Sequence, residues 1–256
     1  MLSIVIFPVS VVSAQQAGRN FDLYLLIGQS NMAGRGEITV EYKNEGNENV
    51  LMLNKENSWV KAKHPLHFDK PSVAGVGPGL SFGIAMLNKS KGHKIGLIPC
   101  AVGGSSIDVW KPGAFDKATS TYPYDDAMKR LTIAMQSGTI KGVIWLQGES
   151  DSDSTKAKDY LSKLKELIGR IRMATNNLKL PFVAGELGQY KEQYKNINDV
   201  LVVLPDKVEY TAVASSKGLR DKGDKTHFDS PSAEKMGKRF ARKMKHLLIR
   251  KAAMKN

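Results

Sequence analysis

Ser30 is the side chain whose surroundings are most typical of a nucleophile. It stands just after the apolar run FDLYLLIG (residues 21–28), in the segment Gly-Gln-Ser-Asn-Met-Ala-Gly. A serine that follows a buried strand is presented at the carboxyl edge of a sheet, where its hydroxyl can attack a carbonyl carbon and its own N–H can face the site. A helix N-cap is the simpler explanation. The segment is not a G-x-S-x-G nucleophile elbow, because Met32 follows Asn31 where that motif requires a glycine.

His227 is the best candidate for a general base. It lies in Asp-Lys-Thr-His-Phe (residues 224–228), with Asp224 three residues before it. A carboxylate at this spacing can turn back to the ring and accept a hydrogen bond from Nδ1, which leaves Nε2 facing a serine hydroxyl. A surface histidine is the alternative explanation. The other histidines have no such local partner: His64, His67, His93 and His246.

Two further segments end apolar runs and offer hydrogen-bond donors. Gly103 and Gly104 follow KIGLIPCAV (94–102), and Gln147 lies at the end of KGVIWLQG (141–148). The N–H groups of glycine can approach an oxyanion because no Cβ intervenes, and a glutamine amide is a further donor. A tight turn is the simpler explanation of the glycine pair. Together the segments predict an oxyanion hole beside a serine nucleophile.

The elements that must position these residues alternate between buried strands and longer helices. This order is typical of a parallel sheet covered by helices on both faces. The length of 256 residues suits one domain, over residues 20–250. We therefore expect an α/β fold, a flavodoxin-like three-layer α/β/α architecture with a central parallel sheet of about five strands. Apolar runs that fit strands lie at 21–28, 49–54, 94–102, 141–148, 180–187 and 208–215, and helical patterns at 77–90, 124–137, 154–175 and 230–250.

Several residues are expected to start or stop helices. Ser230 before Pro231 predicts an N-cap followed by proline in the first turn. Asp151 or Ser152 is expected to cap the helix that follows the strand ending near Gln147. The segment 189–204 is ambiguous, helical for most of its length and stopped by Pro205.

The formal net charge of +13 is concentrated near the carboxyl terminus. Residues 234–256 hold nine Lys and Arg against Glu234 alone, and apolar residues recur there at helical spacing. The segment predicts an amphipathic helix with a solvated basic face, and attraction to an anionic polysaccharide or cell envelope is the functional alternative. Nothing resembles a helix-turn-helix, zinc-finger or RNA-binding signature, so we expect no nucleic-acid partner.

Residues 1–14 have the features of a signal peptide. An apolar run ends in small residues, with Val12 and Ala14 fitting a signal-peptidase site before Gln15. The run is too short to span a bilayer, and no later segment has eighteen consecutive apolar residues, so we expect a secreted or periplasmic protein without membrane insertion. The run lacks a positively charged start, so an alternative start codon or a buried first strand is the competing explanation.

We expect neither a metal nor a cofactor. The single cysteine, Cys100, lies in an apolar run and excludes an intramolecular disulfide and a cysteine-based metal cluster. His64 and His67 with Asp69 are only weak evidence for a metal site. The core must therefore supply the stability.

The combination of segments resembles the SGNH hydrolases. Within them it is most similar to the sialate O-acetylesterase and acetyl xylan esterase group, carbohydrate esterase family 6. The resemblance covers roughly residues 20–248 and rests on GQSNMAGRG, PCAVGGSSIDVW, WLQGESD and DKTHF. It implies the SGNH fold and a serine esterase that removes O-acetyl groups from acetyl xylan or a related acetylated glycan through an acyl-enzyme.

The resemblance also implies roles for individual residues. Ser30 would be the nucleophile and His227 the base, with Asp224 favoured over Glu149 as the acid that orients the base. Gln147 stands where SGNH hydrolases usually have asparagine, as in the carbohydrate-esterase group. The oxyanion hole would be formed by Ser30, Gly103 or Gly104, and Gln147. Apart from the resemblance, we expect substrate to be bound by Gln29, Asn31, Ser105 and Arg35, with Trp110 and Tyr124 as further candidates for the sugar site.

Three alternative functions remain at this point. A non-catalytic carbohydrate-binding domain would need a broken set of catalytic residues, whereas every required residue type is present. An SGNH esterase or lipase acting on non-sugar acyl esters would expose an apolar patch beside Ser30, whereas these loops are rich in small, polar and charged residues. A nucleic-acid binder rests on the net charge alone. The sequence does not specify the oligomeric state.

Overall fold

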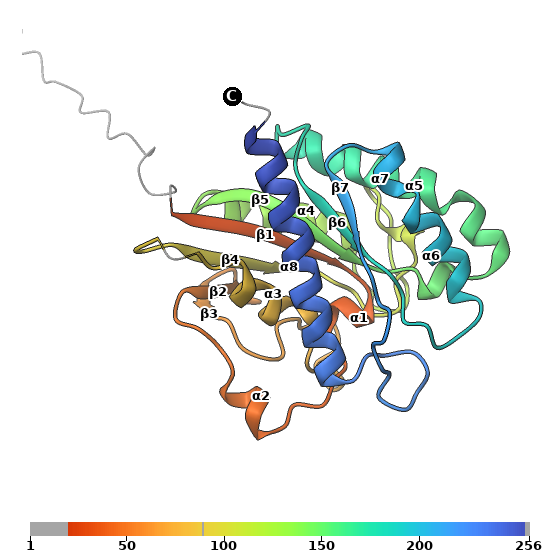
Figure 1. Ribbon diagram of the computed structural model, residues 1–256, viewed down its shortest axis with the longest axis horizontal. Coiled ribbons are helices and arrows are strands. Elements are labelled where there is room, and N and C mark those ends of the chain that lie inside the picture. Colours follow the sequence, from red (N-terminus) through yellow and green to blue (C-terminus); the bar gives the residue numbers. More distant parts are fainter. Residues whose placement is uncertain (1–19, 89, 254–256) are drawn as a thin grey trace, which may run out of the picture.

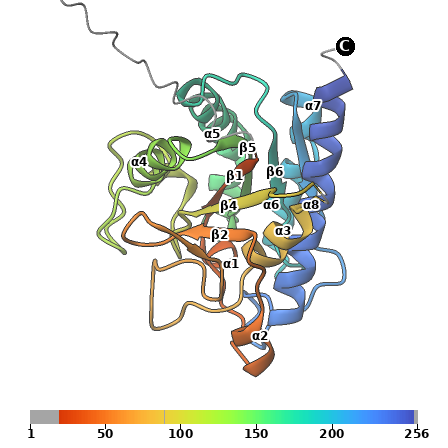
Figure 2. The same cartoon turned by 90° about the vertical axis from the view of Figure 1, so that its left-hand side faces the viewer.

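The computed structural model describes residues 20–88 and 90–253 of the chain (Figure 1). The predicted signal peptide, residues 1–14, lies outside the described residues. A central sheet stands between two groups of helices (Figure 2), as expected for an α/β fold of three layers. Within the described residues, no helix combines the length and the apolar character that a bilayer crossing requires.

The central sheet has seven strands: β1 (Phe21–Gly28), β2 (Val50–Leu53), β3 (Trp59–Lys61), β4 (Lys94–Pro99), β5 (Thr139–Leu146), β6 (Phe182–Gly185) and β7 (Thr211–Ala214). Their order across the sheet is β3-β2-β4-β1-β5-β6-β7. β3 runs antiparallel to β2, and the other neighbouring pairs are parallel. The five strands β4-β1-β5-β6-β7 follow the order 2-1-3-4-5 that is found in flavodoxin-like sheets.

The expectation of about five strands was therefore wrong, because β2 and β3 extend the sheet beyond β4. β3 has only three residues, and two of them are exposed. A short, solvated edge strand has no apolar run, so the sequence pattern could not reveal it.

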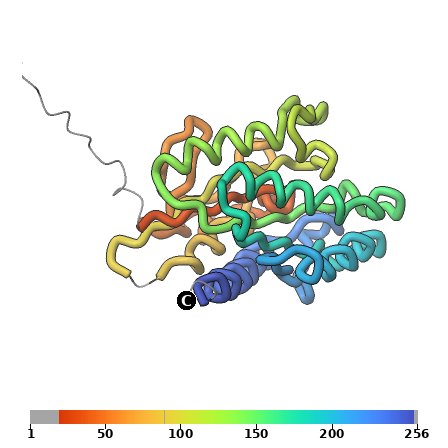
Figure 3. The backbone as a smooth tube through the Cα atoms, turned by 90° about the horizontal axis from the view of Figure 1, so that it is seen from above, coloured from red at the N-terminus to blue at the C-terminus, as the bar shows by residue number. Residues whose placement is uncertain are grey.

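Helices cover both faces of the sheet. α3 (Pro78–Met86) and α8 (Ser230–Ala253) pack on one face, and α4 (Pro123–Met135) and α5 (Ser154–Ala174) pack on the other (Figures 2 and 3). β1 is buried on both sides because helices cover both faces of the sheet, and its successive side chains point to opposite faces. Its residues 23, 25 and 27 join the core under α4 and α5, and its residues 24 and 26 join the core under α3 and α8.

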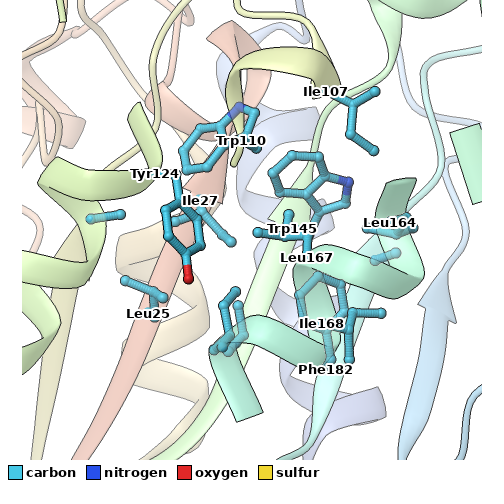
Figure 4. Close-up of a cluster of buried hydrophobic side chains, with 14 of the residues drawn as sticks. Leu25, Ile27, Ile107, Trp110, Tyr124, Trp145, Leu164, Leu167, Ile168 and Phe182 are labelled. Carbon is cyan, nitrogen blue, oxygen red and sulfur yellow. The ribbon is translucent and has the colours of Figure 1, made fainter. Parts of the chain in front are cut away.

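Two aromatic residues that were candidates for the sugar site belong to the core instead. Trp110 is 1% exposed and meets Trp145 edge to face, with 5.3 Å between ring centroids (Figure 4). Tyr124, in the first turn of α4, packs in the same cluster. Burial of these rings stabilises the layer between the sheet and α5. The expectation that they line the substrate site was wrong.

The carboxyl-terminal helix has the predicted amphipathic character. Met236, Phe240, Met244 and Leu247 are buried on the sheet side of α8. Its exposed side carries lysine and arginine residues: Lys235, Lys238, Arg242, Lys245 and Arg250. The positive charge is therefore a surface property of this helix.

The predicted cap of α5 needs correction. Asp153, rather than Asp151 or Ser152, caps α5, because its carboxylate accepts the N–H groups of Thr155 and Lys156 at 3.0 Å each. Asp153 directly precedes the helix, whereas the other two residues lie further upstream. The helix begins at residue 154, as the pattern indicated, and the N-cap is the residue directly before that start, not one two or three residues before it.

The cap of α8 also differs from the prediction, and lies one residue before the predicted Ser230. The carboxylate of Asp229 accepts the N–H of Ser232 at 2.8 Å, as an N-cap does. Ser230 instead donates its hydroxyl to the carbonyl oxygen of Glu37 at 2.7 Å. The long-range bond ties the start of α8 to the loop after β1.

The ambiguous segment 189–204 forms α6 (Tyr194–Val202), and the next residues form α7 (Leu204–Lys207). Pro205 lies in the first turn of α7, where a missing N–H has no cost, and therefore does not stop a helix. Four other short helices were not predicted because so few residues show no periodicity: α1 (Ser30–Ala33), α2 (Val40–Asn44), η1 (Ile107–Val109) and η2 (Glu149–Asp151).

Candidate active site

The candidate residues meet at the carboxyl edge of the sheet. Ser30 follows β1, the Gly103–Gly104 turn follows β4, Glu149 follows β5, and the 224–228 loop lies between β7 and α8. Because these strands are parallel neighbours, their carboxyl ends bring the four segments together.

Ser30, His227 and Asp224 form a continuous chain of hydrogen bonds. Ser30 Oγ lies 3.0 Å from His227 Nε2, and His227 Nδ1 lies 2.7 Å from Asp224 Oδ2. Ser30 is 6% exposed and begins α1, but its hydroxyl makes no helix cap. Nucleophile, imidazole and carboxylate thus have the order and spacing of an acyl-transfer triad.

The 224–228 loop holds the carboxylate and the ring together locally. Asp224 Oδ1 accepts the N–H of Thr226 at 2.9 Å and that of His227 at 2.8 Å, which leaves Oδ2 for the ring. Burial works to raise the pKa of Asp224, but the hydrogen bonds from His227 and Thr226 outweigh it and lower this pKa to about 2. The carboxylate is therefore ionised throughout the neutral range.

Glu149 does not bond to the histidine. Its Oε1 accepts a hydrogen bond of 2.6 Å from Asn31 Nδ2, and its buried Oε2 has no hydrogen-bond partner within the described residues. Burial raises the pKa of Glu149, although the hydrogen bond from Asn31 acts in the opposite direction. Of the two carboxylates that the sequence left open, the structure places Asp224 on His227.

The two glycines of the turn after β4 have different surroundings. The N–H of Gly103 donates to Asp69 Oδ2 at 2.7 Å and is therefore engaged within the protein. Gly104 is exposed and has a φ of +86°, a conformation that favours glycine. Within the described residues, no hydrogen bond engages the N–H of Ser30 or that of Gly104. These two N–H groups are available to an oxyanion.

A buried ion pair supports this turn from behind. Arg35 Nη2 lies 2.7 Å from Asp69 Oδ2, and Arg35 Nη1 donates to the carbonyl oxygen of Gly34 at 2.7 Å. A Cβ on Gly103 would lie 2.3 Å from Arg35 Nη2 and 2.8 Å from Asp69 Oδ2, so any larger residue would have to displace the ion pair. Burial works to raise the pKa of Asp69, but Arg35 outweighs it and holds the pKa below its usual value. Arg35, a predicted substrate ligand, is instead 8% exposed and supports the glycine turn.

Gln147 offers no free donor, contrary to our expectation for the oxyanion hole. Its side chain is fully buried, and Nε2 contacts three acceptors at 2.5 to 3.1 Å: Gln29 Oε1, Ser105 O and Asp151 Oδ2. The Tyr160 hydroxyl lies 2.8 Å from the carbonyl oxygen of Gln147 and 2.9 Å from Gln147 Oε1, and can donate to either. With two hydrogens and three acceptors, the amide ties the loops after β1, β4 and β5 together.

The other predicted substrate ligands are also engaged within the protein. Gln29 Oε1 accepts from Gln147 and from the backbone after β5, and Ser105 Oγ accepts from Trp110 Nε1 at 3.0 Å. The carboxamide of Asn31 has partners at both ends. All three residues are at most 3% exposed, so the structure makes them a support for the site and does not present them to substrate.

A cleft that the sequence did not indicate borders the histidine loop. Lys191 Nζ donates to Thr226 Oγ1 at 3.0 Å, next to the base. Lys191 also lines a cleft of about 520 Å³ between the loop after β6 and α6, together with Tyr190, Tyr194, Asn198 and other residues. The segment was ambiguous in sequence, and its polar residues carried no motif that could have revealed a cleft.

The histidines considered for a metal site have other surroundings. Ala101 donates its N–H to His67 Nδ1 at 3.2 Å, and burial lowers the pKa of His67 to about 3, which keeps the ring neutral. Asp69 is paired with Arg35. Across residues 20–88 and 90–253, no group of three or more histidine, cysteine or acidic side chains is arranged to hold a metal ion.

The comparisons with known proteins agree with this fold. Residues 20–246 match the family model described as carbohydrate esterase, sialic acid-specific acetylesterase. The class of protein is therefore a hydrolase that acts on ester bonds. The chain belongs to the sialic acid-specific acetylesterase family of carbohydrate esterases.

A probable carbohydrate esterase of Arabidopsis thaliana is 30% identical over 234 residues, which cover 84% of this chain and 86% of that protein. The crystal structure of an Arabidopsis thaliana protein has a TM-score of 0.78 at 29% identity and covers 88% of this chain and 98% of that one. Two other solved structures share the fold. NanS has a TM-score of 0.69 at 15% identity and covers 91% of this chain and 99% of that one. A carbohydrate acetylesterase from Xanthomonas citri has a TM-score of 0.68 at 19% identity and covers 89% of this chain and 57% of that one.

Proposed function

We propose that this protein is an SGNH-type serine esterase that removes O-acetyl groups from a glycan through an acetyl-enzyme. The observation that carries the proposal is the hydrogen-bonded chain from Ser30 Oγ through His227 to Asp224. Membership of an acetylesterase family supports the acetyl group as the acyl portion.

In the first half-reaction, Ser30 Oγ attacks the ester carbonyl carbon while His227 Nε2 accepts the hydroxyl proton. Asp224 keeps the proton on Nδ1 and stabilises the imidazolium that forms. The carbonyl oxygen becomes an oxyanion, and the N–H groups of Ser30 and Gly104 stabilise it. The bond to the sugar oxygen then breaks, His227 returns its proton to that oxygen, and the acetyl group stays on Ser30.

In the second half-reaction, water replaces the sugar. His227 accepts a proton from the water as its oxygen attacks the acetyl carbonyl, and the same two N–H groups stabilise the second oxyanion. The bond to Ser30 Oγ breaks, and the proton passes from His227 to the serine. Acetate leaves, and the enzyme returns to its starting state.

The surroundings of the site favour a sugar over a lipid as leaving group. The cleft beside Thr226 is lined by the half-buried ring of Tyr190 and by exposed charged side chains: Lys191, Glu192, Lys195 and Asp199. Sugars offer hydroxyl groups to such polar side chains and apolar ring faces to tyrosine. We propose that the glycan extends from Ser30 into this cleft. Acetyl xylan, other acetylated glycans and acetylated sialic acid are the substrates to compare.

The test uses esters of different acyl length. Wild-type protein should hydrolyse 4-nitrophenyl acetate much faster than a long-chain nitrophenyl ester, and Ser30→Ala should abolish the activity. Acetate release from a panel of acetylated glycans then identifies the leaving group. Activity that survives in Ser30→Ala would refute Ser30 as the nucleophile, and a preference for long chains would refute the acetyl assignment.

We also propose that the chain is exported, on the basis of the apolar run in residues 1–14. Expression of the full chain with its own amino terminus should give a mature protein that begins at Gln15 in the extracellular or periplasmic fraction. Amino-terminal sequencing of the purified protein checks this, and an uncleaved Met1 would contradict it.

A further inference from the structure

The side chain of Asn31 is bonded to the backbone on both sides of His227. Asn31 Nδ2 donates to the carbonyl oxygen of Thr226 at 2.9 Å, and Asn31 Oδ1 accepts the N–H of Phe228 at 3.0 Å. The same Nδ2 donates to Glu149 Oε1 at 2.6 Å. Asn31 is 3% exposed, so these bonds are shielded from water.

We propose that Asn31 is a positioning residue that locks the loop carrying His227 to the turn carrying Ser30. Asn31 is the next residue to the nucleophile, and its two backbone partners belong to the peptide groups that flank the histidine. Bonds to both peptide groups fix the direction in which the imidazole leaves the backbone. The proposal rests on the proposed function, because it concerns the same acyl transfer.

The bonds within the loop 224–228 cannot fix the position of His227 relative to Ser30. Asp224 binds the ring and the N–H groups of Thr226 and His227, all inside the same five residues. These contacts preserve the pairing of carboxylate and imidazole wherever the loop lies. The Phe228 ring anchors the end of the loop in the core, but it does not touch the turn through a directional bond. Asn31 therefore sets the distance from His227 to the nucleophile.

Glu149 determines which way the Asn31 carboxamide faces. Its Oε1 and the carbonyl oxygen of Thr226 are both acceptors, so the amide nitrogen must lie towards them. The N–H of Phe228 is a donor, so the amide oxygen must lie towards it. The buried carboxylate thus supports the base through Asn31 and not by contact with the ring.

The first experiment removes the carboxamide. In Asn31→Ala, kcat/KM on 4-nitrophenyl acetate should fall about 100-fold, the size of effect that a displacement of about 1 Å causes in an active site, and most of the loss should be in kcat. The low-field NMR signal of the His227 Nδ1 proton should remain, because the contact with Asp224 is intact. Asp224→Asn is the matched control in which that signal should be lost.

The second experiment exchanges donor and acceptor. Asn31→Asp conserves size but places a carboxylate against Glu149 and against a carbonyl oxygen, so its activity at neutral pH should be no higher than that of Asn31→Ala. In the double variant Asn31→Asp/Glu149→Gln, the glutamine amide can donate to the new carboxylate, and kcat/KM should recover at least tenfold. This pair of nearly isosteric variants keeps the proposal testable if Asn31→Ala fails to fold.

Each result decides the proposal. A folded Asn31→Ala protein with kcat/KM within threefold of wild type would overturn it, as would a double variant no more active than Asn31→Asp. Loss of the low-field proton in Asn31→Ala would overturn it too, because Asn31 would then act on the Asp224–His227 pair itself. Full activity in Ser30→Ala would refute the proposed function instead, so the two failures are distinguishable.

Discussion

The carboxylate of Asp69 accepts a hydrogen bond of 2.7 Å from the N–H of Gly103 through the same oxygen that pairs with Arg35. One glycine of the turn is thereby held in place, and the next glycine, Gly104, keeps its N–H free. A buried charge pair thus occupies one of two adjacent N–H donors, and the other has no hydrogen-bond partner within the described residues.

Gly104→Ala should lower kcat by about 10²- to 10³-fold, with a smaller change in KM, because one oxyanion donor is displaced. A Cβ at this position has room, but the φ of +86° is strained for alanine and the turn must shift. Gly113→Ala is the matched control, since Gly113 has a φ of +71° with similar open space and lies outside the site. Steady-state kinetics of both variants check the prediction, and equal losses would contradict it.

Asp69→Ala should reduce the free energy of unfolding by about 3 to 5 kcal/mol, because it leaves the buried Arg35 guanidinium without a counter-charge. Glu48→Ala provides the comparison: its ion pair with Lys61 is exposed, and its loss should cost less than about 1 kcal/mol. Urea denaturation of the two variants measures the difference. Similar stabilities would show that the Arg35–Asp69 pair contributes little.

Asp224→Asn should lower kcat by about 10⁴-fold, because the histidine loses the partner that fixes its tautomer. Glu149→Gln should lose less than about tenfold, since the amide oxygen of the introduced side chain can still accept from Asn31. Kinetics on 4-nitrophenyl acetate separate the two carboxylates. A larger loss in Glu149→Gln would assign the triad acid to Glu149.

Lys191→Ala should raise KM for an acetylated glycan about tenfold, equivalent to about 1.4 kcal/mol of binding, if the glycan occupies the cleft beside Thr226. The change in kcat/KM on 4-nitrophenyl acetate should be much smaller, because that ester has no sugar to fill the cleft. Lys238→Ala, on the exposed side of α8, controls for the loss of a positive charge. Equal effects of Lys191→Ala on both substrates would place the glycan elsewhere.

The pH dependence of stability should reveal the titration of a half-buried carboxyl group, that of Glu234, which lies away from the site. Burial and the neighbouring carboxylate of Glu45 raise the pKa of Glu234 from 4.5 to about 7. Because the folded state binds this proton more tightly than the unfolded state, stability should fall as pH rises from about 4.5 to about 7 and level off above it. Glu234→Gln should reduce this slope in urea denaturations between pH 4 and pH 8. An unchanged slope would contradict the assignment.

The sequence by itself determined the positions of residues whose contacts depend on near neighbours along the chain. Asp224 reaches His227 because the two are three residues apart in one loop, and Ser30 lies at the sheet edge because it follows a buried strand. The amphipathic α8 was also readable, since the period of its apolar residues fixes which side is buried. These features depend on spacing along the chain, and spacing is what a sequence records.

The tertiary structure alone decided which polar groups remain free to act. Gln147, Arg35 and Asn31 have side chains that suit substrate binding, yet residues far away in sequence occupy their donors. Asp69, 34 residues before Gly103, likewise accepts the N–H of Gly103 and leaves that of Gly104 unbonded. Hydrogen-bonding capacity is used up by partners that only folding brings near, so residue type predicts which groups can donate but not which are still available.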